Sequence, residues 1–196
     1  MKKFVISAIA IIVFNSTKAQ IQFGLKAGVN IATLTLSSDV SGSGESLSSK
    51  TDFNAGILAS VPLFNSFTLQ PEINYSGQGA KGSDGTTTTT VNYNYINVPV
   101  LFKFNHSSGL FAETGPQIGF LISANAKAGG QSVDIKDQIS STDFSWCFSL
   151  GYKLSDIPLG IDLRYNLGLS NTVKASGEGT SKNSVFQFGI FYLFGN

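Results

Sequence analysis

Seven charged residues stand within the apolar stretches of this chain, and they are the first candidates for chemistry. They are four bases and three acids: Lys26, Lys103, Lys153, Arg164, Glu72, Glu113 and Asp162. A charged side chain inside a protein is costly unless it is paired, so a set of mixed sign indicates a structural ion-pair network. The alternative function for such a set is a path for protons or ions.

The sequence His106–Ser107–Ser108 is the second candidate, because a histidine base beside a serine nucleophile could form a hydrolase site. The residues are adjacent in a short polar turn, where base and nucleophile seldom face each other. We therefore expect a polar turn and no catalytic residues.

Sites for metals and cofactors are not expected. Cys147 is the only cysteine, so it has no partner for a disulfide or for a thiolate metal site. Asp134 and Asp137 supply fewer oxygen ligands than a calcium loop needs. We expect Cys147 to be a small filler of the interior and the two aspartates to be solvated.

The first 19 residues have the three regions of a cleaved signal peptide. Lys2 and Lys3 precede an apolar run at 4–14, and Thr17 and Ala19 fit the cleavage-site pockets. As a retained anchor, the 11-residue run 4–14 would span only about 16 Å, roughly half of the bilayer core. We predict cleavage before Gln20 and a single domain over 20–196.

The composition of the mature chain excludes some partners and suggests another. Removing residues 1–19 takes away three of 13 basic residues and none of 12 acidic ones, leaving 10 − 12 = −2. A weakly negative chain without a basic cluster is not expected to bind nucleic acid. Charged residues make up only 13%, beside 21 glycines and 16 phenylalanines, so much of the surface should face something other than water.

Alternation of apolar and polar residues recurs along the mature chain and predicts an all-β protein. Eight segments show it: 22–31, 53–61, 67–76, 90–104, 109–122, 144–153, 159–168 and 184–194. The fourth breaks parity, because Val91, Tyr93 and Tyr95 are out of phase with Ile96. We interpret this break as a bulge or as a part of the strand that projects above a membrane.

Short and long connections alternate strictly. Tight turns are expected at 62–66, 105–108 and 155–158, and long polar links near 35–50, 79–90, 124–141 and 171–183. This alternation is typical of an up-and-down barrel with one rim toward the periplasm and the other toward the outside. An even number of strands brings both termini to the short-turn rim.

The placement of charges distinguishes a membrane barrel from a soluble one such as a lipocalin. All seven charges in the strands lie on the more polar face, and the opposite face carries none. If the apolar face pointed inward, roughly 40 large side chains would have to fit inside the barrel. An eight-stranded barrel is only just wide enough for its inward-facing set. We predict an eight-stranded antiparallel up-and-down transmembrane β-barrel, with Trp146 in its aromatic belt.

Three motifs together resemble the PorT-type outer-membrane β-barrel family. They are Gly24, Lys26, Gly28 and Asn30 in the first strand, 96–103 (INVPVLFK) in the fourth and 115–119 (GPQIG) in the fifth. The last strand also resembles an outer-membrane assembly signal, with Phe188, Ile190, Tyr192 and Phe194 at alternate positions, but it departs by ending in Gly195 and Asn196 and not on the aromatic residue. The resemblance implies an outer-membrane barrel that contacts membrane lipids and, during biogenesis, the barrel-assembly machinery.

The function that we expect is non-enzymatic: a monomeric integral outer-membrane protein with a structural role, or with a surface-interaction role through its long loops. The sequence does not identify the partner of the loops. Two alternatives remain, a lipid A hydrolase-like enzyme that uses His106 and a neighbouring serine, and a narrow ion or solute channel. The His106 turn should face the periplasm, and a barrel of this size favours a closed interior.

Overall fold

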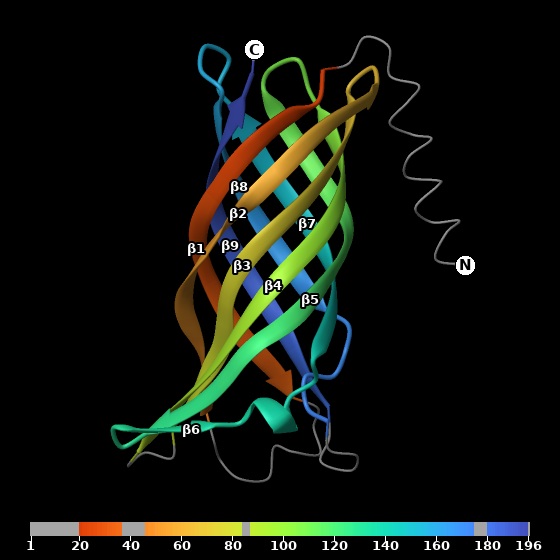
Figure 1. Ribbon diagram of the computed structural model, residues 1–196. Helices are drawn as coiled ribbons and strands as arrows, with labels where there is room; N and C mark the ends of the chain where they lie inside the picture. Colours follow the sequence, from red (N-terminus) through yellow and green to blue (C-terminus); the bar gives the residue numbers. More distant parts are fainter. Residues whose placement is uncertain (1–19, 37–45, 84–86, 175–179, 196) are drawn as a thin grey trace, which may run out of the picture.

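The computed structural model describes residues 20–36, 46–83, 87–174 and 180–195 and shows a closed antiparallel barrel (Figure 1). The strands are β1 (Gln22–Leu36), β2 (Ser46–Phe64), β3 (Phe67–Ser83), β4 (Thr88–Asn105), β5 (Leu110–Ala128), β6 (Gln131–Asp134), β7 (Thr142–Lys153), β8 (Leu159–Gly168) and β9 (Ser181–Phe194). Eight of them form the ring, which closes where β1 pairs with β9, and β6 pairs with β5 alone. The predicted eight-stranded up-and-down barrel is confirmed. Residues 1–19, including the predicted cleavage site, lie outside the described residues.

The barrel forms because the period-two pattern gives each strand one apolar and one polar or small face. Leu25, Ile57, Ile73 and Leu163 are among the large apolar residues on the outside, each at least half exposed. Residues between them, such as Arg164, are buried inside the ring. Among the described residues, no helix is both long and apolar enough to cross a membrane.

The two rims of the barrel differ as the spacing predicts. At one rim, tight turns join β2 to β3, β4 to β5 and β7 to β8, and the start of β1 and the end of β9 lie there too (Figure 1). Asn65 and Gly109 have positive φ angles of 45° and 93°, as tight turns require. The longer connections are at the opposite rim.

Parts of the predicted long links are strands. Residues 79–83 and 88–90 continue the β3–β4 hairpin beyond the expected ends, because the threonine run favours extended backbone. Within 124–141, β5 continues to Ala128, turns at Gly129 and Gly130 and returns as β6. A short 3-10 helix, η2 (Lys136–Gln138), follows. Residues 37–45, 84–86 and 175–179 lie outside the described part.

Of the two interpretations of the fourth strand, a bulge is found beside Tyr95, but it lies in the neighbouring strand β5. Tyr93 and Tyr95 keep the alternation of β4 and point inward, with exposed fractions of 4% and 0%. The register shift lies opposite them, because Asn94 pairs with Ser123 while Tyr95 pairs with Leu121. The extra residue is therefore in β5, and Tyr93 and Tyr95 are out of phase with Ile96 because their aromatic side chains face the interior.

Candidate functional site

The centre of the barrel holds an arginine clamped between two carboxylates. Arg164 of β8 donates from Nη1 and Nη2 to the two carboxylate oxygens of Glu72 on β3, both at 2.8 Å. Its Nη2 also lies 3.2 Å from Glu113 Oε2 on β5. The side chains of Arg164 and Glu72 are completely buried. Bidentate geometry with full burial makes this the strongest type of ion pair.

Two further ion pairs complete the network. Lys26 Nζ on β1 lies 2.6 Å from Asp162 Oδ2 on β8. Lys103 Nζ on β4 lies 3.1 Å from Glu113 Oε1 and 3.6 Å from the centre of the Phe111 ring. The six residues are the lumen network: Lys26, Glu72, Lys103, Glu113, Asp162 and Arg164. Three positive and three negative charges cancel within it.

Lys153, the seventh residue of the predicted set, is not part of this network. It lies at the last position of β7, beside the short turn that follows, and is only half-buried. No ion pair involving it is found within the described ranges. Its parity puts it on the inner face, but its position along the barrel axis separates it from the carboxylates.

One buried ion pair was missed by the sequence reasoning. Lys50 and Asp52, both in β2, form an ion pair near the long-link rim, and Lys50 Nζ also donates to the Gln78 carbonyl at 3.2 Å. Both residues continue the alternation of β2 on its inner face, with exposed Thr51 between them. Their spacing of two residues was the available signal, although the segment was assigned to a loop.

An amide cluster lies between the lumen network and the long-link rim. Asn30 donates to Ser76 Oγ at 2.9 Å and to the Gly77 carbonyl at 2.8 Å. It accepts hydrogen bonds from Asn54 at 2.6 Å and from Gln187 at 2.9 Å. These bonds join the inner faces of four neighbouring strands, β3, β2, β1 and β9.

Apolar clusters lie at both ends of the polar interior. Near the short turns, Phe111 and Phe191 meet edge to face with ring centres 5.7 Å apart, beside Leu58 and Leu193. Near the long-link rim, Tyr93 and Tyr95 pack with Leu121, Ala124 and Ile139. The polar interior thus lies between two apolar clusters, as in a barrel whose interior is filled by side chains.

The His106 turn is more ordered than expected. His106 Nδ1 lies 2.8 Å from Ser108 Oγ, so the structure brings together the two side chains that the sequence reasoning placed apart. The backbone N–H of Ser108 donates to the same Nδ1 at 3.2 Å. In the described part of the chain, no carboxylate is hydrogen-bonded to the His106 ring.

Two other residues singled out in the sequence lie on opposite faces of β7. Cys147 is fully buried in the lumen, 3.6 Å from Gln117 Oε1. Trp146 faces outward and donates from Nε1 to Thr114 Oγ1 at 2.8 Å. Asp134 and Asp137 are exposed, and among the described residues no three His, Cys, Asp or Glu side chains are grouped as a metal site requires.

Comparison with solved structures shows the same type of barrel. Neisserial surface protein A is 15% identical with a TM-score of 0.54, covering 88% of this chain and 97% of that protein. OprG from Pseudomonas aeruginosa is 10% identical with a TM-score of 0.50, covering 91% and 98%. Ail from Yersinia pestis is 14% identical with a TM-score of 0.48, covering 88% and 98%.

Sequence comparison gives the family. No curated protein sequence matches this chain. The family model described as outer membrane protein beta-barrel domain matches residues 15–174, which is most of the chain. The apolar exterior and the closed ring of strands are what a barrel in a bilayer needs. The chain therefore belongs to the outer membrane protein beta-barrel domain family and is an integral protein of the outer membrane.

Proposed function

We propose that this protein is a sealed, non-enzymatic barrel of the PorT type whose function lies on its long-link surface. The lumen network carries the proposal, because its three bases and three acids neutralise one another inside the barrel. A transport path would need a mobile or unpaired charge and room for water. The interior instead holds paired charges between two apolar clusters.

The long-link rim offers the surface for such a role. The β3–β4 and β5–β6 hairpins extend past the barrel wall in Figure 1, and all four residues of β6 are exposed. Lys81 and Lys127 are exposed and lie on either side of Thr90 in adjacent strands. A polar platform of paired strands can contact other molecules while the closed barrel fixes it in the membrane.

Membrane lipids and the barrel-assembly machinery are the partners that we propose besides a ligand of the loops. The apolar exterior supports the lipid contact, and the alternating aromatic residues of β9 support recognition during assembly. We propose a monomer, because the ring is closed and leaves no barrel strand unpaired.

A hydrolase is the second candidate, favoured by the 2.8 Å distance between His106 Nδ1 and Ser108 Oγ. Three observations oppose it. The backbone N–H of Ser108 also donates to His106 Nδ1, the nitrogen that would have to accept the serine proton. No described carboxylate orients the imidazole, and the turn lies at the rim opposite the long links. The pair is better explained as a hydrogen-bonded turn.

The orientation of the barrel can be tested with single cysteines, because Cys147 is fully buried and should not react. Ser132 lies on exposed β6, and Ser66 lies in the exposed β2–β3 turn. Ser132→Cys is therefore the test variant, and Ser66→Cys is its matched control. A membrane-impermeant maleimide should label Ser132→Cys on intact cells, and Ser66→Cys only after the outer membrane is opened. Labelling of Ser66→Cys on intact cells would place the long links in the periplasm and refute a surface role.

A further inference from the structure

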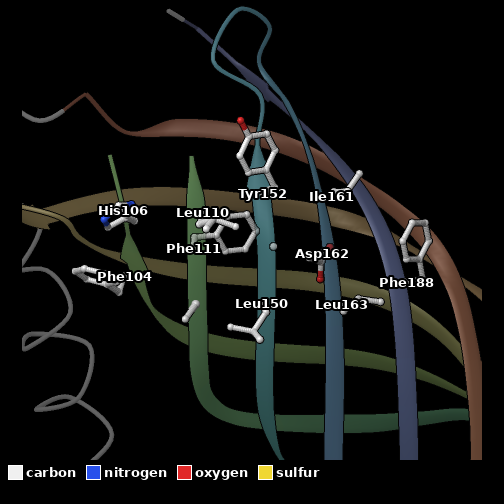
Figure 2. Close-up of a pocket in the computed structure, with 12 residues that line it drawn as sticks. Phe104, His106, Leu110, Phe111, Leu150, Tyr152, Ile161, Asp162, Leu163 and Phe188 are labelled. Carbon is white, nitrogen blue, oxygen red and sulfur yellow. The ribbon is translucent and has the colours of Figure 1, made fainter. Parts of the chain in front are cut away.

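An apolar groove of about 630 Å³ lies on the outer face of the barrel at the short-turn rim (Figure 2). A second groove of about 560 Å³ continues it toward the middle of the barrel. Both are lined by Phe104, Ala112, Leu150 and Leu163, so they form one continuous hollow, which we call the β5 groove.

The register of the strands explains the β5 groove. Ala112 of β5 lies directly between Phe104 of β4 and Leu150 of β7. One pair further along, Thr114 lies between Phe102 and Phe148. A methyl group and a hydroxyl side chain thus form the floor, and large apolar side chains form the walls.

The β5 groove has a defined length. The groove begins at Leu110 beside the turn and extends along β5 to Thr114, whose hydroxyl accepts the hydrogen bond from the Trp146 indole at 2.8 Å. The four steps from Leu110 to Thr114 along an extended strand span about 13 Å. The two volumes are each within the range of about 300–1,000 Å³ that is typical of sites for small ligands.

Two polar side chains, His106 and Tyr152, stand at the mouth of the groove. The Ser108 N–H donates to His106 Nδ1, so we assign the proton of the neutral ring to Nε2, which is left as a donor. In Figure 2 the Tyr152 hydroxyl points toward the β7–β8 turn, away from Leu150. An imidazole N–H and a phenol O–H at one rim are suitable donors to a phosphate oxygen.

We propose that the β5 groove binds one acyl chain of a glycerophospholipid of the periplasmic leaflet, with the lipid phosphate at His106 and Tyr152. The groove is continuous with the exterior belt that faces hydrocarbon, so an acyl chain needs no opening to enter it. This site goes beyond the surface role proposed above and rests on the same orientation of the barrel, which the maleimide labelling tests separately from lipid binding.

Native mass spectrometry of the detergent-solubilised protein can test the site, with dipalmitoylphosphatidylethanolamine as the probe. The unmodified protein should retain one phospholipid, and dipalmitoylglycerol, which lacks the phosphate, should bind roughly tenfold more weakly. Ala112→Phe fills the groove and should abolish retention. Its matched control is Ala27→Phe, another outward-facing alanine, on β1, which should leave retention unchanged.

The mouth is tested separately. His106→Ala and Tyr152→Phe should each weaken binding of the phospholipid roughly three- to tenfold without changing binding of dipalmitoylglycerol. Tyr192→Phe, at the same rim but outside the β5 groove, should have no effect. Circular dichroism and the unfolding midpoint must match the unmodified protein for each variant.

Three results would overturn the proposal. Equal loss of lipid in Ala112→Phe and Ala27→Phe would mean that the belt binds lipid without a specific site. Equal binding of the phospholipid and dipalmitoylglycerol would exclude phosphate recognition. Release of palmitate by the unmodified protein but not by Ser108→Ala would show hydrolysis in place of binding.

Discussion

Removing one partner of the central ion pair should destabilise the barrel strongly. In Glu72→Ala, the Arg164 guanidinium keeps only the contact of 3.2 Å to Glu113 Oε2 and a longer approach of 3.9 Å to Asp162. At about 4 Å and an effective dielectric constant near 20, one unit pair attracts by roughly 4 kcal/mol. Loss of a partner from a completely buried pair therefore costs about 3–5 kcal/mol in the free energy of unfolding.

The double substitution Glu72→Leu with Arg164→Met separates the pair from simple packing. It removes both charges and fills similar volumes, so it should cost less than either single truncation, Glu72→Ala or Arg164→Ala. Urea unfolding in lipid vesicles can be followed through Trp146, the one tryptophan of the chain, which faces outward. A cost below about 1 kcal/mol for Glu72→Ala, or a double variant as unstable as the sum of the single ones, would refute this reasoning.

Two other predictions concern the membrane face and the leader. Ile57→Arg and Leu163→Arg place a charge among side chains that are 55% and 62% exposed on the outer face. Each should lower the free energy of unfolding in a bilayer by about 2–4 kcal/mol, and Ser60→Arg on the inner face should lower it less. Equal losses for all three variants would mean that the apolar faces point into the barrel. The mature protein should begin at Gln20 by intact mass, and a mature form that retains Met1 would contradict cleavage of the leader.

The eight strands, their faces and the short turns could be predicted because the alternation is a local property of the chain. Lys26, Glu72 and Arg164 were assigned to the inner face by parity alone, and the structure places them there. Parity does not give the position of a residue along the barrel axis. Lys153 was grouped with the other charges for this reason, although it lies at the rim.

A register shift between two strands limited the prediction of inward and outward residues near the long-link rim. The irregularity was placed in the fourth strand because of Tyr93 and Tyr95, but the extra residue lies in β5, where it reverses the alternation after Ile122. The ion pair of Lys50 with Asp52 was missed for another reason, because both residues precede the predicted strand 53–61 although β2 begins at Ser46. Bulges depend on the pairing of two strands, and a single strand's sequence does not show where its neighbour has an extra residue.

The lumen network and the β5 groove use the two faces of the same strand for different purposes. Glu113 points into the ring and balances Lys103 and Arg164, while Ala112 and Thr114 on either side of it form the floor of the groove. The interior network can therefore be altered without changing the groove. This separation allows the sealed lumen and the lipid site to be tested independently.

Electrical recording in a planar bilayer tests the sealed lumen most directly. Purified unmodified protein should show no unitary conductance, because paired charges and the Phe111–Phe191 contact fill the bore. The double variant Glu113→Ala with Arg164→Ala removes the centre of the network and is the comparison that could admit water. Stable unitary currents from the unmodified protein would contradict the sealed barrel and support a channel.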